Sequence, residues 1–139
     1  MAGYSGTPLP QKLGVKAGSR LVLVNAPAEA AAWLTPLPPG VRPRRARVPD
    51  PAGSVDVLLL FCLQRDMLAR QLQSWLPALT AAGGLWVAWP KRSSGVKTDL
   101  DEAAVRTAGL ATGLVDNKVC AISEVWSGLR FVTRLKDRG

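Results

Sequence analysis

Three short apolar runs constrain the fold of this chain more than any other feature of its sequence. They lie at residues 21–24, 57–62 and 85–89, and each is nearly continuous rather than alternating. A run of this kind is typical of a strand that is covered on both faces, as in a parallel sheet. Segments with the composition or spacing of helices lie between the runs, which predicts an α/β fold with helices on the sheet faces.

The remaining segments complete a predicted order of elements. Thr7 is the expected N-cap of the first helix, and Thr98 or Asp99 that of the last, because an acid follows three residues after each of the latter two. The predicted elements are a helix at residues 7–14, a strand at 20–25, a helix at 28–34, an edge strand at 44–48, a strand at 54–62, a helix at 64–80, a helix stop at 81–84, a strand at 85–89, a helix at 98–112, and a hairpin of strands at 114–123 and 129–135. The sequence therefore predicts one three-layer Rossmann-like domain over residues 1–139, mostly parallel, with a C-terminal antiparallel hairpin.

Composition limits the compartment and the partners. No apolar run of the 139 residues approaches the roughly 20 needed to span a bilayer, and the N-terminus lacks a signal-peptide pattern. We therefore expect a cytoplasmic protein with no membrane association. The 18 basic residues exceed the 10 acidic ones, and the resulting net charge of +8 favours anionic partners, such as nucleotides, nucleic acid or an acidic protein surface. The sequence does not determine the oligomeric state.

The absence of histidine restricts the chemistry. It excludes a Ser-His-Asp or Cys-His mechanism built within this chain, and it removes the commonest metal ligand. The two cysteines, Cys62 and Cys120, lie in apolar surroundings and are expected to be free and buried. We therefore predict neither a metal site nor a catalytic residue.

The turn after the first predicted strand lacks the glycines of a cofactor-binding loop. A dinucleotide or S-adenosylmethionine (SAM) fold usually places a Gly-x-Gly turn there, so that the backbone can approach the ligand. This chain has Asn25-Ala-Pro-Ala28 instead, and no glycine occurs between Gly18 and Gly40. Asp50 is the one acid available to hold a ribose after the second strand. On these grounds we predict no cofactor, and SAM only if the chain is a minimal methyltransferase.

A proline-rich segment at residues 35–53 also contains four arginines. Without nearby acids, they could form a patch that contacts the phosphates of nucleic acid, or they could simply keep a solvated connection soluble. These residues are Arg42, Arg44, Arg45 and Arg47.

The candidate ligand site lies where the parallel strands end, because ligands of open α/β sheets bind beyond the carboxyl ends of the strands. A small-residue, cationic loop follows the third run there, and it could contact an anionic or aromatic ligand. The candidate residues are Asn25, Trp89, Lys91, Ser93, Ser94, Gly95, Thr98, Glu124 and Trp126. Trp86 and Trp89 cannot share one face of a strand, so at least one belongs to the core. The loop can equally be a turn followed by a helix cap.

Two resemblances support this interpretation. Residues 55–90, with an Asp-Val-Leu-Leu-Leu strand, a helix and then Gly-Gly-Leu-Trp-Val, are similar to a shortened class I methyltransferase fold. Nearly the whole chain also resembles an uncharacterised bacterial family of short proteins of unknown function. The motifs that carry this resemblance are Ser-Gly-Thr-Pro-Leu at 5–9, Lys-Leu-Gly at 12–14, Asn-Ala-Pro at 25–27, Gly-Leu-Trp-Val at 84–87, Trp-Pro-Lys at 89–91, Ser-Gly-Val-Lys-Thr-Asp-Leu at 94–100, Lys-Val-Cys-Ala at 118–121 and Glu-Val-Trp-Ser-Gly-Leu at 124–129. The family implies no activity.

Three functions are consistent with the sequence. The first is a non-catalytic Rossmann-like module that binds an anionic small molecule, a nucleotide or a protein partner at the carboxyl edge of the sheet. The second is a minimal SAM-dependent methyltransferase, for which Glu124 is the best remaining acid or base. The third is a basic protein that binds nucleic acid through the four arginines.

Overall fold

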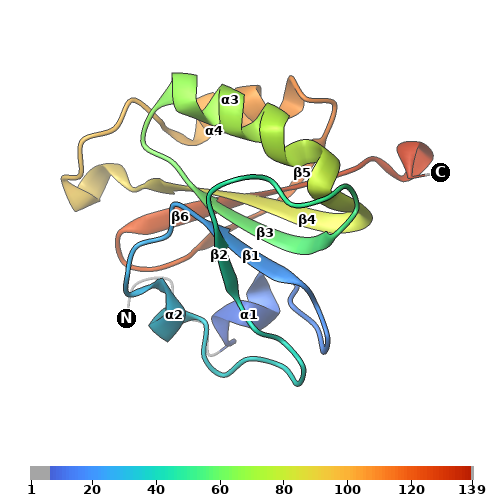
Figure 1. Cartoon of the computed structure of the whole chain (residues 1–139). Coiled ribbons are helices and arrows are strands. Elements are labelled where there is room, and N and C mark those ends of the chain that lie inside the picture. Colours follow the sequence, from blue (N-terminus) through green and yellow to red (C-terminus); the bar gives the residue numbers. More distant parts are fainter. Residues whose placement is uncertain (1–6, 139) are drawn as a thin grey trace.

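The computed structural model describes residues 7–138, which form a six-stranded sheet with helices on both faces (Figure 1). The strands are β1 (Leu21–Val24), β2 (Arg44–Ala46), β3 (Val55–Phe61), β4 (Leu79–Pro90), β5 (Val115–Ala121) and β6 (Trp126–Val132). The α-helices are α1 (Leu9–Lys12), α2 (Ala30–Trp33), α3 (Arg65–Trp75) and α4 (Glu102–Leu110). The 3-10 turns are η1 (Leu76–Ala78), η2 (Arg92–Ser94) and η3 (Leu135–Asp137).

The strand order is β2-β1-β3-β4-β6-β5. The first four of these strands pair in parallel, whereas β6 pairs antiparallel with both β4 and β5. The predicted mostly parallel Rossmann-like sheet with a C-terminal hairpin is therefore confirmed. From β1 the chain first moves outward to β2 and then returns to the other side of β1 to form β3. The order thus reverses between β1 and β3, and in open α/β sheets ligands bind at such a reversal.

Burial on both faces explains why the apolar runs form the central strands. All four residues of β1 are buried, and so are six of the seven residues of β3. Helices α3 and α4 cover one face of the sheet, and α1 and α2 cover the other (Figure 1). Trp89 packs on the α3/α4 side and is 5% exposed, whereas Trp86 is fully buried on the α1/α2 side. Both tryptophans are therefore core residues on opposite faces.

Several predicted boundaries are wrong. Pro8, not Thr7, is the N-cap of α1, and no side chain caps this helix. Residues 81–84 are not a helix stop but belong to β4, because α3 already ends at Trp75 and the turn that contains Pro77 follows it. The second strand of the hairpin starts at Trp126, so the connection is shorter than predicted.

The last helix also begins later than either proposed cap. Asp101 is its N-cap, and its carboxylate accepts a hydrogen bond of 2.8 Å from the N–H of Ala104. This helix lies close to β6 because it carries a glycine at the contact. A Cβ atom at Gly109 would lie 2.0 Å from Cε1 of Phe131, so no larger residue fits without a shift.

No helix formed by residues 7–138 combines the length and the hydropathy required to cross a bilayer.

Candidate ligand site at the carboxyl edge of the sheet

The carboxyl ends of β1 and β3 form the centre of the candidate site. Val24 and Leu60 are register partners in the parallel pair, so the segments that follow the two strands leave the sheet side by side. Asn25 bridges them: its Nδ2 lies 3.5 Å from the carbonyl oxygen of Phe61. This is the reversal in strand order at which doubly wound folds bind their ligands.

Asn25 also provides the backbone conformation that the missing glycine would have supplied. Its φ angle is +56°, in the left-handed region, and it is the only residue other than glycine between 7 and 138 with a positive φ. Asparagine tolerates this region better than other residues with a Cβ atom. The turn after β1 is therefore retained without glycine, and the small side chains of Ala26 and Ala28 follow it.

Arg45 fixes the same loop from the edge strand β2. Its Nη1 donates to the carbonyl oxygen of Ala26 at 3.0 Å, and its Nη2 donates to those of Pro27 at 3.1 Å and Ala28 at 3.3 Å. One guanidinium thus holds three consecutive carbonyl groups, because its donors form a rigid planar fork. The side chain of Arg45 therefore connects the loop after β1 to β2 by hydrogen bonds.

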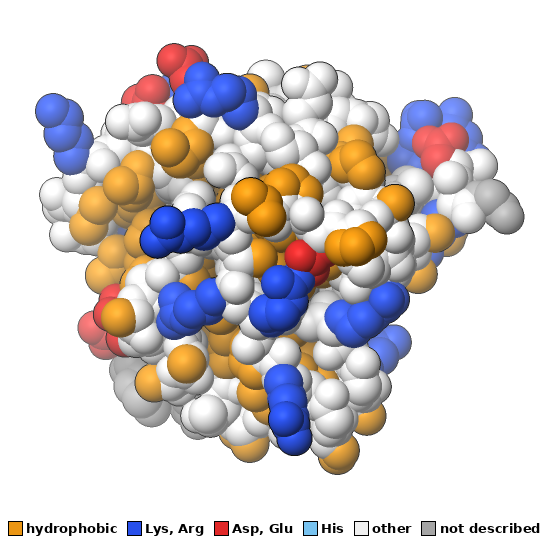
Figure 2. Space-filling view, viewed as in Figure 1, with side chains coloured by type: hydrophobic (Ala, Val, Ile, Leu, Met, Phe, Trp, Pro, Cys, Tyr) orange, Lys and Arg blue, Asp and Glu red, His pale blue; other side chains and the backbone are white. Residues whose placement is uncertain are grey.

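The four arginines of the proline-rich segment differ in their contacts within the protein, and their binding of nucleic acid stays a prediction. Arg44 forms an ion pair with Asp50, and Arg45 is bound to the loop after β1. Arg42 and Arg47 are exposed. Figure 2 shows cationic side chains over the face of the molecule that carries β2, with little acidic surface between them. The pairing of Asp50 also removes the one acid that the sequence offered for a ribose after β2.

An aromatic cluster borders the site on the α1/α2 side of the sheet. Phe61 at the end of β3 is the centre of the cluster, and Trp126 meets it edge-on at a centroid distance of 5.0 Å. Trp33 of α2 packs on the same ring at 6.3 Å. Trp126 and Trp33 are only partly buried, so part of each indole faces solvent. The sequence identified Trp126 but missed Trp33, because its position next to Phe61 depends on how α2 folds back onto the sheet.

The cationic loop after β4 packs against the start of α3. Thr98 donates its hydroxyl to the carbonyl oxygen of Leu63, and Asp99 accepts a hydrogen bond of 2.9 Å from the N–H of Arg65. Arg65 returns a side-chain bond of 2.9 Å to the carbonyl oxygen of Asp99. The loop therefore lies against the segment that follows β3, on the α3/α4 side of the sheet.

Several candidate polar groups of this loop are engaged in local turns. The Ser94 hydroxyl donates to the carbonyl oxygen of Lys91 at 2.7 Å and accepts from the N–H of Val96 at 3.2 Å. Gly95 has a φ of +77° and ends η2, whereas Ser93 is exposed. The side chain of Lys91 is partly buried. Its backbone N–H donates to the carbonyl oxygen of Val125, which extends the pairing of β4 with β6 by one hydrogen bond.

The two other candidate groups differ in exposure. Glu124 is exposed in the connection between β5 and β6. Trp89 is buried in the core with little of its ring open to solvent, and its contact with a ligand stays a prediction. Burial also raises the pKa of the Cys62 thiol, which donates to the carbonyl oxygen of Gln64. The thiol at this edge is therefore protonated at neutral pH and is a poor nucleophile.

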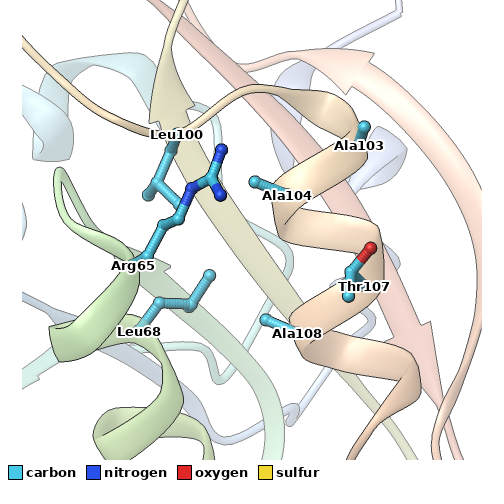
Figure 3. Close-up of a pocket in the computed structure, with 7 residues that line it drawn as sticks. All are labelled: Arg65, Leu68, Leu100, Ala103, Ala104, Thr107 and Ala108. Atoms are coloured by element: carbon cyan, nitrogen blue, oxygen red, sulfur yellow. The ribbon is translucent and has the colours of Figure 1, made fainter.

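A separate groove of about 380 Å³ lies between α3 and α4. Its walls are mostly aliphatic, and in Figure 3 the guanidinium of Arg65 extends over one end of it. Small side chains of α4 leave this space open, among them Ala104 and Ala108. It lies on the opposite face of the sheet from the aromatic cluster.

Comparisons with known proteins identify the fold. No family model matches the sequence, and no curated protein matches it. Solved structures do match: a SAM-dependent methyltransferase from Aquifex aeolicus has a TM-score of 0.63 at 12% identity, covering 87% of this chain and 85% of that one. Fibrillarin from Aeropyrum pernix with natively bound S-adenosyl-L-methionine has a TM-score of 0.58 at 17% identity, covering 89% and 73%. LepI in complex with SAM has a TM-score of 0.55 at 16% identity, covering 91% of this chain but only 39% of LepI.

These neighbours establish a methyltransferase-like Rossmann fold. The resemblance to a bacterial family of unknown function has no support from them and stays a prediction. The predicted absence of a cofactor is contradicted, because neighbours of this fold are crystallised with SAM or with its demethylated product. That prediction assumed that the turn after β1 needs glycine, whereas Asn25 gives this turn a positive φ of +56° without one. The comparisons therefore favour the methyltransferase alternative over the non-catalytic module.

Proposed function

We propose that this chain binds SAM at the carboxyl edge of its sheet and serves as the cofactor-binding part of a methyltransferase. The observation that carries the proposal is the left-handed turn at Asn25, located where the strand order reverses between β1 and β3. A turn at this point lets the backbone approach a ligand that lies across the two strand ends.

The residues at the edge fit the cofactor in two respects and depart from the usual pattern in one. The turn from Asn25 to Ala28 carries small side chains, and hydrogen bonds from Arg45 fix its carbonyl groups. The partly exposed rings of Trp33 and Trp126 suit an adenine base, because aromatic side chains and bases stack face to face. The ribose contact departs from the usual pattern, because Asp50, the acid that the sequence offers after β2, is paired with Arg44.

When bound, SAM supplies an electrophilic methyl group, and the work of this chain is to bind and orient it. Arg45 acts as a positioning residue, because it touches the loop rather than the ligand. Glu124 is an exposed carboxylate on the nearby β5–β6 connection and is the proposed acceptor of a proton from a substrate. The chain spans less than half of LepI, so the substrate site can include protein beyond the matched region.

Isothermal titration calorimetry with SAM tests the proposal on the wild type and on two variants that differ only at position 25. Asn25→Gly preserves the left-handed turn and loses only the bridge to Phe61, so we expect saturable binding close to that of the wild type. Asn25→Val strains the turn, because a β-branched residue is a rare occupant of this region, so we expect binding to weaken at least about tenfold, or roughly 1.4 kcal/mol. Circular dichroism controls for folding. Flat heats with the wild type, or equal affinities for the two folded variants, contradict the proposal.

A further inference from the structure

Arg130 of β6 is a half-buried cation to which residues 7–138 offer no hydrogen-bond partner. Its Nε atom is fully shielded from solvent and makes no hydrogen bond. The ion pairs formed by this part of the chain use other arginines, namely Arg20, Arg44, Arg106 and Arg134. An N–H group that is shielded from water and makes no hydrogen bond is costly, because it loses its bond to water and gains none in exchange.

The nearest charged groups increase this cost instead of relieving it. Lys118 is the direct partner of Arg130 in the antiparallel β5–β6 pair, and like charges at such positions repel. The Nζ of Lys118 donates to the carbonyl oxygen of Lys12 at 3.0 Å, which brings the lysine to the α1 side of the sheet. Burial, and then the charge of Arg138, lower the pKa of Arg130. Arg130 and Lys118 therefore lie side by side, and neither takes part in an ion pair within residues 7–138.

Gly84 makes room for the guanidinium, and Gly14 lies beside it. A Cβ atom at Gly84 of β4 would lie 2.5 Å from Nε of Arg130 and 2.9 Å from its Nη2. A Cβ atom at Gly14, just after α1, would lie 3.7 Å from the same Nη2. The guanidinium thus lies against the backbone of β4, between the end of α1 and the C-terminal part of β6.

This location is separate from the carboxyl edge. Trp126 pairs with Pro90 at that edge, whereas Arg130 lies four residues further along β6 and pairs with Trp86. At about 3.3 Å per strand residue, the separation is about 13 Å. The cations are therefore not part of the proposed SAM site.

We propose that Arg130 and Lys118 form a binding site for a phosphate group on the α1 side of the sheet. The planar fork of a guanidinium matches two oxygens of a phosphate. A phosphate carries up to two negative charges at neutral pH, so it neutralises more than one of the converging cations, whereas a carboxylate neutralises one. The phosphate is either the free ion or the end group of a phosphate monoester.

Thermal unfolding at constant ionic strength tests the site, with inorganic phosphate or glycerol 3-phosphate replacing chloride. The wild type should unfold at a temperature that rises with the logarithm of phosphate concentration, as expected when a ligand binds only the folded state. Arg130→Met should reduce this rise to the general stabilisation that phosphate salts give a folded protein. In chloride alone this variant should unfold no earlier than the wild type, because it removes a partly buried cation whose Nε makes no hydrogen bond. Phosphorus NMR should show broadening of the phosphate signal by the wild type and not by Arg130→Met.

Arg134→Met is the matched control, because it removes the same charge from a nearby exposed position whose arginine already pairs with Asp137 at 2.8 Å. This variant should keep the full phosphate response. Lys118→Met, at an exposed position that tolerates replacement, should weaken the response several-fold. A response to the monoester as well as to free phosphate assigns the site to phosphorylated molecules, and a response to free phosphate alone assigns it to the ion. An equal rise in wild type and Arg130→Met overturns the proposal, as does an undiminished rise in Lys118→Met.

Discussion

Gly109→Ala tests whether α4 packs on β6 as closely as the structure shows. The new Cβ atom would lie 2.0, 2.2 and 2.6 Å from three ring carbons of Phe131, where ordinary contact begins at 3.4 Å. Phe131 is fully buried, so its ring has no solvent-exposed space to enter. The ring or the helix must therefore move by more than one ångström.

Two opposing effects set the magnitude. Overpacking of a core costs about 1–3 kcal/mol, whereas alanine in place of glycine favours a helix by about 0.5–1 kcal/mol. The net expectation is a loss of about 1–2 kcal/mol in the free energy of unfolding, which corresponds to a fall of about 3–8 °C in the unfolding temperature of a domain this size.

Urea unfolding followed by circular dichroism measures this loss. Thr107→Ala and Thr107→Gly form the reference pair, because position 107 is exposed within the same helix and their difference isolates the helix-propensity term. After this correction, Gly109→Ala should remain destabilised. A variant as stable as the wild type, or more stable, would refute the close contact between Gly109 and Phe131.

Two further predictions concern the loop after β1 and the acid stability of the sheet. Arg45→Met removes three hydrogen bonds to an exposed loop, so it should lower the free energy of unfolding by about 1 kcal/mol and speed amide exchange at Ala28. The charge-matched control Arg42→Met should do neither. An unchanged exchange rate in Arg45→Met would contradict the role of Arg45 in holding the loop. Asp56 accepts a hydrogen bond from Arg20, and this bond lowers the pKa of the Asp56 carboxyl. The ionised carboxylate therefore stabilises the fold above about pH 4, and this contribution disappears as the pH falls through the lowered pKa. Asp56→Asn should therefore be less stable than the wild type at pH 7 and approach it near pH 3 in urea midpoints, and a difference independent of pH would contradict this assignment.

The fold was largely predictable because it depends on local patterns. Buried parallel strands require continuous apolar runs, and the runs that contain Leu23, Leu59 and Val87 have no other common structural use at that length. The faces of Trp86 and Trp89 followed from the two-residue period of a strand. Element boundaries were less predictable, because Thr98, Asp99 and Asp101 are all competent helix caps and tertiary contacts selected the last of them.

The candidate site was only partly predictable, because its geometry depends on contacts between distant segments. The sequence named Asn25 and Trp126 as candidates, and the structure places both next to Phe61 at the end of β3. Their contact with a ligand stays a prediction. It could not reveal that Asn25 has a positive φ, since asparagine occupies several backbone regions and the surrounding structure selects one. It also could not show that Arg45 holds carbonyl groups 17–19 residues away, which made the arginines look like a uniform patch.

The loop after β4 illustrates a different limitation. Its serines, lysines and threonine have the composition of an anion site, but hydroxyl groups serve turns and ligands equally well. In the structure Ser94 and Thr98 hydrogen-bond to backbone groups of the protein. Composition alone could not distinguish the two roles, because that choice depends on whether a carbonyl group such as that of Leu63 lies within reach.

The most direct test of the central claim is an amide NMR titration of the wild-type protein with SAM. We expect saturable shifts concentrated at residues 25–29 and 62–64, which follow the carboxyl ends of β1 and β3, with little change in α4 or near Arg130. Such a pattern would show that the retained turn binds the cofactor where the strand order reverses. Absence of any saturable shift, or shifts centred on the groove between α3 and α4, would contradict the account.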